Sequence, residues 1–263
     1  MTMSEKDIRQ EIWEIWEKEE GNCSGCPAHN LSYTPSYGGK EGKSIEEFEV
    51  MIVLSDPNED RHDEPSDDGK LSGDDEEWNY GYHADNGWDM MEDYLNPIVR
   101  QITGHGDADD VYFTNAHKCP TYADDGLSEG FERDLRSLEH CQSYLEDEIE
   151  AVNPEVVVAL SNESIAAVGE VMTKHEFNAS KGSGRYTGAT RYVEEWIRDK
   201  KRFYGLDPAV VAGVHPAKPN SGASISRHTN IELNQFGDTD TNWSESYYQE
   251  LALSIDSALS GGT

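Results

Sequence analysis

The chain has 263 residues, which is long enough for one sizeable hydrophobic core in a single domain. It carries 53 acidic residues against 21 basic ones, and this formal net charge of −32 argues against a simple nucleic-acid binder with a basic surface. The acidic residues are spread along the whole sequence, as in proteins of salt-in halophiles, where high ionic strength screens self-repulsion. The composition therefore indicates a haloarchaeal source.

The sequence shows no targeting segment. Its amino terminus is charged rather than apolar, and no stretch approaches the roughly 18 apolar residues that a membrane span needs. We expect a cytoplasmic protein that has no membrane partner. Its few cysteines cannot form a disulfide scaffold for a chain of this size, so metal binding becomes their leading explanation. They are Cys23, Cys26, Cys119 and Cys141.

The first 45 residues combine a helical pattern, a cysteine pair and a loop. Apolar side chains recur at helical spacing from Ile8 to Trp16, which predicts an amphipathic helix that ends at Gly21. Cys23 and Cys26 then form a C-x-x-C turn, which fits either a redox-active pair or one half of a zinc site. The rest is a loop rich in Gly, Ser and Tyr.

Apolar runs alternate with helical patterns along the remaining chain. The runs predict strands at residues 49–55, 111–114, 155–160 and 210–214. Helical patterns lie at residues 88–99, 131–149, 165–172, 192–197 and 247–255. This alternation predicts an α/β fold with a parallel sheet that is covered on both faces. We expect one domain over residues 1–263, with an acidic surface-loop insertion at 59–80.

Polar side chains follow three of the predicted strands. Asp56 follows the first, Asn115 the second and His215 the fourth. The carboxyl ends of parallel strands share one edge of the sheet, where ligands bind, so these residues are candidates for a functional site. Each also has a plainer interpretation, because Asp before Pro and Asn are common in turns and a histidine can cap a strand end.

A series of motifs carries a resemblance to a known family. In chain order they read C-x-x-C-P, G-Y-x-x-x-x-G, Y-F-T-N-x-x-K-C, C-x-x-Y-L-x-x-E-I, P-x-V-V-V-A-L and H-P. Together they resemble the iron–sulfur uracil-DNA glycosylases of the family 4 and 5 type, between Gly21 and His215. The resemblance implies a three-layer α/β/α fold with a central four-stranded parallel sheet. It also implies a monomeric enzyme that hydrolyses uracil, or a related damaged base, from DNA.

The resemblance gives the cysteines a common role. In that family the cysteines of these motifs hold a structural [4Fe–4S] cluster, and Cys₄ ligation is the usual way to hold one. The matching residues are Cys23, Cys26, Cys119 and Cys141, which are all the cysteines of the chain. Tetrahedral Cys₄ ligation would also suit zinc. Read by itself, Cys141 lies on the apolar face of a predicted helix and could be a core cysteine.

Similar enzymes flip the uracil out of the duplex and read it in a pocket. The resemblance implies that Tyr82, where the family usually has Phe, stacks on the base. It also implies that Asn115 hydrogen-bonds the polar edge of uracil, because an amide both donates and accepts hydrogen bonds. His215 would stabilise the departing base anion, and an acid would orient or activate the water.

The first motif departs from the family pattern. Family 4 has Gly-Glu-Ala-Pro-Gly where this chain has Leu54-Ser55-Asp56-Pro57-Asn58, so Ser55 stands at the position of the glutamate. Family 1 enzymes have Gln-Asp-Pro there and use that aspartate on the water. We therefore take Asp56 as the catalytic acid and keep Ser55 as a substrate-binding candidate. Cys119-Pro120-Thr121 and His215-Pro216-Ala217 also replace Cys-Arg-Pro-Pro and His-Pro-Ser.

Two other functions stay open. One is a catalytically degenerate iron–sulfur DNA-binding protein of the same fold, and the other is a zinc-braced hydrolase that acts on a different small substrate. Basic residues near the expected edge of the sheet form either a strip that contacts DNA or a scatter of solubility residues. They are Lys118, Lys181, Arg185, Arg191, Lys218 and Arg227.

Overall fold

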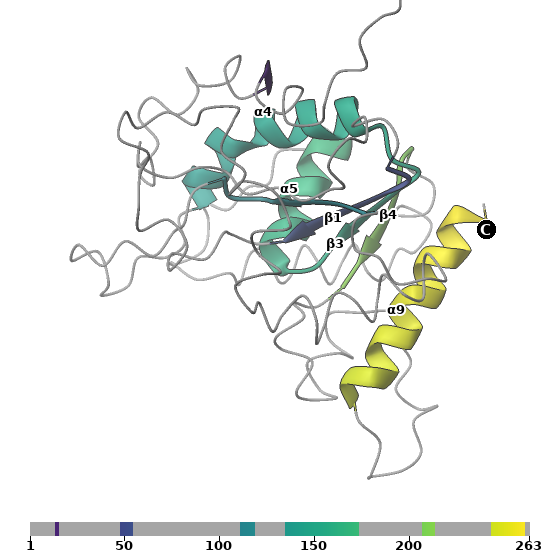
Figure 1. Cartoon of the computed structure of the whole chain (residues 1–263). Coiled ribbons are helices and arrows are strands. Elements are labelled where there is room, and N and C mark those ends of the chain that lie inside the picture. The colour runs from purple at the N-terminus through teal and green to yellow at the C-terminus, as the bar shows by residue number, and fades with distance from the viewer. Residues whose placement is uncertain are drawn as a thin grey trace, which may run out of the picture.

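The computed structural model describes residues 14–15, 48–54, 111–118, 135–173, 207–213 and 243–260 (Figure 1). The elements in these segments are β1 (Val50–Leu54), β2 (Tyr112–Asn115), α4 (Leu135–Val152), β3 (Val156–Ala159), α5 (Asn162–Thr173), β4 (Ala209–Ala212) and α9 (Trp243–Leu259). Each falls on a stretch for which the sequence predicts the same kind of element. Helices α5 and α9 extend beyond their apolar patterns at both ends, because polar residues also occupy helical turns.

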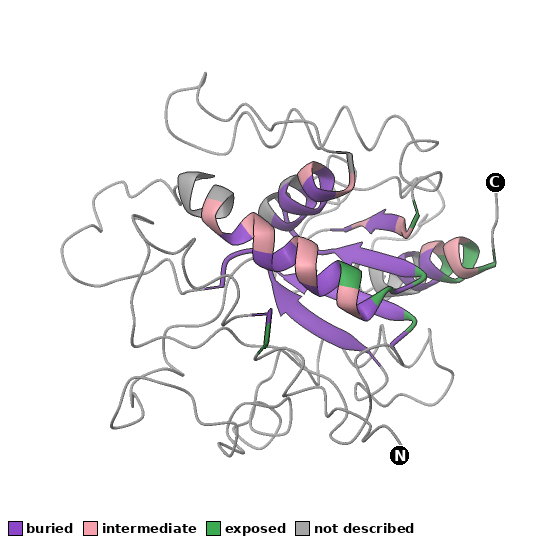
Figure 2. Cartoon of the chain, turned by 90° about the horizontal axis from the view of Figure 1, so that it is seen from above, coloured by how far each residue is buried: buried purple, intermediate pink, exposed green. Residues whose placement is uncertain are grey.

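The four strands form one sheet in the order β2-β1-β3-β4, and all the neighbouring pairs are parallel. Every residue of β1, β2 and β3 is buried, which is the burial expected of parallel strands with both faces covered (Figure 2). The α/β fold class that the sequence predicts is therefore confirmed.

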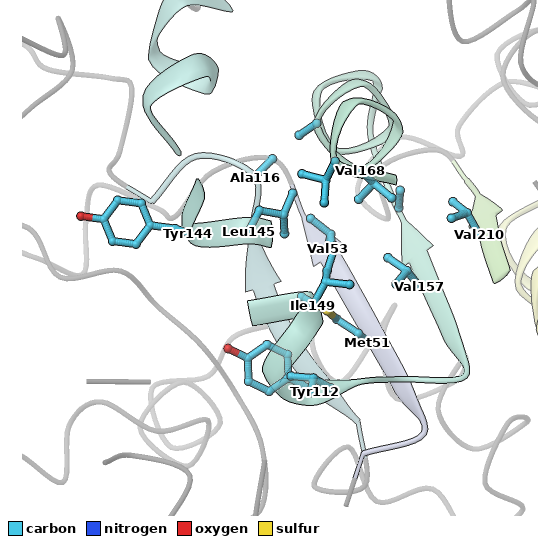
Figure 3. Close-up of a cluster of buried hydrophobic side chains, with 14 of the residues drawn as sticks. Met51, Val53, Tyr112, Ala116, Tyr144, Leu145, Ile149, Val157, Val168 and Val210 are labelled. Carbon is cyan, nitrogen blue, oxygen red and sulfur yellow. The ribbon is translucent and has the colours of Figure 1, made fainter. Parts of the chain in front are cut away.

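Helices α4 and α5 pack on one face of the sheet. Side chains alternate between the faces of a strand, and one buried cluster contains Met51 and Val53 of β1 with Val157 of β3 (Figure 3). The same cluster contains Leu145 and Ile149 of α4, together with Ile165 and Val168 of α5. The residues with odd numbers in β1 therefore face these two helices.

Helix α9 covers the other face, where it lies beside β3 and β4 (Figure 1). Among the side chains of α9 whose burial is described, at residues 251–259, the buried ones are Leu251, Ala252 and Ile255, and their spacing of three and four residues forms one helical stripe. Val158 and Val211 are buried and do not belong to the cluster under α4 and α5, as expected of side chains on the opposite face. The molecule thus has the three layers of an α/β/α fold.

Two local signals position the turns that flank β3. Helix α4 ends at Val152, and Asn153 adopts φ of 47° while its N–H donates to the carbonyl of Ile149 at 2.9 Å. A left-handed residue followed by Pro154 is a standard helix stop. After β3, Ser161 caps α5 by accepting the N–H of Ser164 at 2.9 Å. Both helix ends thus agree with their sequences.

Several predicted features lie outside the described residues. They are the helices at residues 88–99 and 192–197 and the acidic insertion at 59–80. The prediction of a single domain over residues 1–263 also stays a prediction. Of the amino-terminal helix the structure describes Glu14 and Ile15, which are helical, and Ile15 belongs to the buried cluster. In the part of the chain that the structure describes, no helix has the length and apolar character needed to cross a membrane.

Candidate active site at the carboxyl edge of the sheet

The four strands end together at one edge of the sheet. Leu54 at the end of β1 pairs in register with Asn115 at the end of β2. The next backbone amides continue the pairing, with Ala116 N–H donating to the Leu54 carbonyl at 2.8 Å and Leu160 N–H to the Val53 carbonyl at 3.0 Å. Gly213 N–H does the same with the Ala159 carbonyl at 2.8 Å. The backbone therefore holds this edge as one continuous ladder.

The strand order places a topological switch point between β1 and β3. From β1 the chain moves outward to β2, and it then crosses back to β3 and on to β4. In open α/β sheets, ligands bind beyond the carboxyl ends of the strands at such a point. The segments that flank it are the one that follows Leu54, which begins with Ser55, and the Ser161 cap of α5.

Asn115 and Thr114 point to opposite faces of the sheet, because consecutive side chains of a strand alternate. Thr114 pairs in register with Val53 and faces α4, whereas Asn115 shares the register and the face of Leu54. Asn115 is 7% exposed, so its amide is almost wholly removed from bulk water. A buried amide at a strand end can read a flat polar ligand through both its donor and its acceptor.

A buried polar triad occupies the α4 side of the same strand. The Thr114 hydroxyl donates to Glu148 Oε2 at 2.8 Å, and the Lys118 ammonium donates to Thr114 Oγ1 at 2.6 Å. The ammonium also lies 2.5 Å from Glu148 Oε2, and both charged side chains are almost fully buried. Both interpretations of Lys118 from the sequence, as part of a strip that contacts DNA and as a solubility residue, are therefore wrong, because its ammonium is buried against a carboxylate.

Sequence reasoning missed this triad and the Ser161 cap. A partial signal exists for the triad, since Glu148 lies within the apolar stripe of its helix, between Leu145 and Ile149. A carboxylate in that position needs a buried partner. The S-x-x-S spacing of Ser161 and Ser164 could have indicated a helix start.

Cys141 is a buried thiol of α4, and its sulfur accepts the backbone N–H of Lys118 at 3.4 Å. Lys118 directly precedes Cys119 in the sequence. The N–H donated to Cys141 Sγ is compatible with a metal-ligand role for this sulfur, because N–H donors to ligand sulfurs are a regular part of iron–sulfur sites. The other proposed ligands, Cys23 and Cys26, lie outside the described residues, as does Cys119 itself.

The remaining candidates also lie outside the described residues. Asp56 comes two positions after the end of β1, and His215 comes two positions after Gly213, so both segments depart from the carboxyl edge. Ser55 directly follows β1, and Tyr82 belongs to the long connection between β1 and β2. Among the site residues predicted from the sequence, the structure thus describes Asn115 and Cys141, which lie at the end of β2 and on α4.

Comparison with known proteins points to one family. The model of the uracil DNA glycosylase superfamily matches residues 49–232, a span that includes all four strands with α4 and α5. No curated protein matches the chain.

Proposed function

The chain belongs to the uracil DNA glycosylase superfamily, and we propose that it hydrolyses the N-glycosidic bond of uracil in DNA. The observation that carries the proposal is the position of Asn115. Its amide is buried at the carboxyl end of β2 and in register with the strand that leads to Asp56. Asn115 lies one strand spacing, roughly 4.8 Å, from Leu54, and Asp56 follows Leu54 by two residues in the sequence.

In the proposed reaction a flipped uracil enters the pocket and stacks on Tyr82 while Asn115 binds its polar edge. Cleavage of the glycosidic bond leaves positive charge on the sugar and negative charge on the base. Asp56 orients the attacking water and accepts its proton, and His215 stabilises the base anion as the bond breaks. Ser55 is proposed to contact the substrate beside Asp56.

We also propose that Cys23, Cys26, Cys119 and Cys141 hold a [4Fe–4S] cluster. The support is the N–H···S contact of Cys141 and the match of all four cysteines to the family motifs. The cluster would supply structural bracing, since it would tie α4 to the segment that follows Asn115. Zinc, which accepts the same four thiolates, is the alternative metal.

A catalytically degenerate DNA-binding protein is the second candidate function. One feature of the sequence favours it, because Ser55 stands where family 4 has its glutamate. A serine hydroxyl keeps its proton at neutral pH unless a neighbouring base removes it, so Ser55 alone cannot replace the glutamate as a general base. The chain would then recognise uracil with Asn115 and leave the bond intact.

The decisive test is release of free base from a uracil-containing oligonucleotide in molar KCl. The samples are the wild type, Asp56→Asn and His215→Ala, with an oligonucleotide that carries thymine as the substrate control. We expect release by the wild type, and a loss of roughly 10²-fold or more in each variant, as for removal of a general base or of one group that stabilises the anion. Binding of the uracil oligonucleotide should persist in Asp56→Asn.

The outcomes separate the two candidates. Wild-type release that falls in both variants supports the glycosylase and assigns the chemistry to Asp56 and His215. If the wild type binds uracil-containing DNA selectively and releases no base, the degenerate DNA-binding function is correct.

A further inference from the structure

Lys118 and Glu148 are the two charged side chains in the core of the described segments. Lys118 is 3% exposed and Glu148 is 0% exposed. Removing two charges from water is costly, and the attraction between them often does no more than offset that loss. A buried pair of this kind therefore calls for an explanation other than stability.

The geometry of the triad is that of a closed ring. Thr114 Oγ1 donates its one proton to Glu148 and accepts one from Lys118, while Lys118 and Glu148 contact each other directly. A hydroxyl group suits this position because it donates and accepts at the same time. Each side chain is thus fixed by the other two, and the ring joins the end of β2 to α4.

Lys118 is attached to α4 at a second point through its backbone. Its N–H donates to Cys141 Sγ at 3.4 Å, while its ammonium reaches Glu148 seven residues further along the helix. Residues seven apart lie on the same face of a helix, about 10 Å from each other along the axis. One residue thus contacts α4 at two points about two turns apart, and the two contacts together oppose sliding of the segment along the helix and rotation against it.

The opposite side of the same segment is attached to the sheet. Ala116 N–H donates to the Leu54 carbonyl at 2.8 Å, and Asn115, Ala116 and His117 are all buried. Asn115 lies between the two members of the triad that come from this segment, Thr114 and Lys118. Because neighbouring side chains of a strand point to opposite faces, a fixed Thr114 on the α4 side also fixes the direction in which Asn115 points.

We propose that Thr114, Lys118 and Glu148 are positioning residues for Asn115. The triad holds the Asn115 amide in the orientation that binds the uracil edge, and it acts from the face of the sheet opposite to the base. The identity of the ligand that Asn115 binds rests on the proposed function. The positioning of Asn115 by the triad rests on the observed contacts. It assigns a role in base recognition to three side chains that touch neither base nor sugar.

Thr114→Val and Thr114→Ser form the sharpest pair of variants. Valine keeps the shape of threonine and removes the hydroxyl, whereas serine keeps the hydroxyl and removes a methyl group. The double variant Lys118→Met/Glu148→Met replaces the pair by apolar side chains, an exchange that often leaves stability unchanged. Gln142→Leu breaks a different link, from α4 to Glu170 of α5, and is the control for disturbance of the helix.

Three quantities are measured for each variant in molar KCl. The first is the dissociation constant of free uracil, measured by direct titration, and the second is the midpoint of urea unfolding. The third is the rate of hydrogen exchange at the amides of residues 115–118, compared with that of residues 165–171 in α5. We expect Thr114→Val and the double variant to weaken uracil affinity by roughly 10- to 100-fold, as small misplacements of a binding group do. Thr114→Ser and Gln142→Leu should retain affinity within a factor of about three.

Faster exchange confined to residues 115–118, together with weaker uracil binding at an unchanged urea midpoint, supports the positioning role. Wild-type affinity and wild-type exchange in a folded Thr114→Val protein would overturn it. So would a loss of affinity that merely follows the urea midpoint across all four variants. A wild type that neither releases nor binds uracil refutes the proposed function. The exchange rates at residues 115–118 then show by themselves whether the triad holds the segment that carries Asn115.

Discussion

Asn115 stands directly opposite Leu54 on the last rung of the β1–β2 pairing, and the following amide closes the ladder on the Leu54 carbonyl at 2.8 Å. The chain therefore leaves β1 toward Asp56 from the same level of the sheet at which it presents the Asn115 amide. A backbone hydrogen bond thus joins the end of β2, which carries the proposed base-reading group, to the end of β1, two residues before the proposed catalytic Asp56.

Replacement of Asn115 should weaken base reading without unfolding the protein. Asn115→Ala removes a donor and an acceptor, so we expect kcat/KM for uracil release to fall by about 10- to 100-fold, the range for a lost bidentate base contact. Phe113→Leu is the matched control, because Phe113 is buried on the same face of β2. The prediction fails if both variants lose the same activity in steady-state assays, since Asn115 would then matter only for packing.

Cys141 should be required for metal binding. Cys141→Ser removes one proposed ligand, and we expect iron content to fall from about four atoms per chain, with loss of the brown colour of a cluster. Elemental analysis and the visible spectrum measure both effects after anaerobic purification. Ile149→Val, two turns further along α4, is the control and should keep its iron. About one zinc per colourless chain would show that the metal is zinc.

Loss of the Ser161 cap should destabilise the fold. Ser161→Ala leaves the N–H of Ser164 without its acceptor, and we expect the free energy of unfolding to fall by about 1 kcal/mol. Urea titration in molar KCl measures the change. Ser161→Asp can accept the same N–H and should retain most of the stability. Equal losses in the two variants would argue against a capping role.

Asn153 should tolerate glycine better than alanine. Its φ of 47° lies in the left-handed region, which is unfavourable for residues that carry a Cβ and have no local hydrogen bond. We expect Asn153→Ala to lower the free energy of unfolding by about 1 kcal/mol and Asn153→Gly to leave it nearly unchanged. Chemical denaturation of the three proteins decides this, and an alanine variant as stable as the glycine variant would contradict it.

The net charge of −32 should make stability depend on salt. At about 0.1 M salt the screening length is near 10 Å, and at about 1 M it is near 3 Å, so carboxylates repel one another much more in the dilute solution. We therefore expect the thermal midpoint to rise steadily with KCl over this range, and DNA affinity to depend only weakly on salt because few counterions are released. A chain equally stable in dilute buffer would contradict the halophilic interpretation.

The sequence determined which segments form the sheet. Runs such as Val50 to Leu54 are apolar on both sides of the strand, so only a covered, parallel arrangement buries them. The same periodic patterns located α4, α5 and α9, although they did not fix the residues at which these helices begin and end. Position in the sequence also placed Asn115 at a strand end, since side-chain chemistry changes there from apolar to polar.

The tertiary structure decided the order of the strands and the partners of the polar side chains. No local sequence pattern indicates that β3 lies between β1 and β4. In the observed order, β2 and β4 are the two edge strands and lie three strand spacings, roughly 14 Å, from each other. For the same reason the sequence could not distinguish an exposed Lys118 from one buried against Glu148, which is 30 residues away. Local patterns record how a residue relates to its neighbours along the chain, whereas a pair of buried charges exists only after distant segments have packed together.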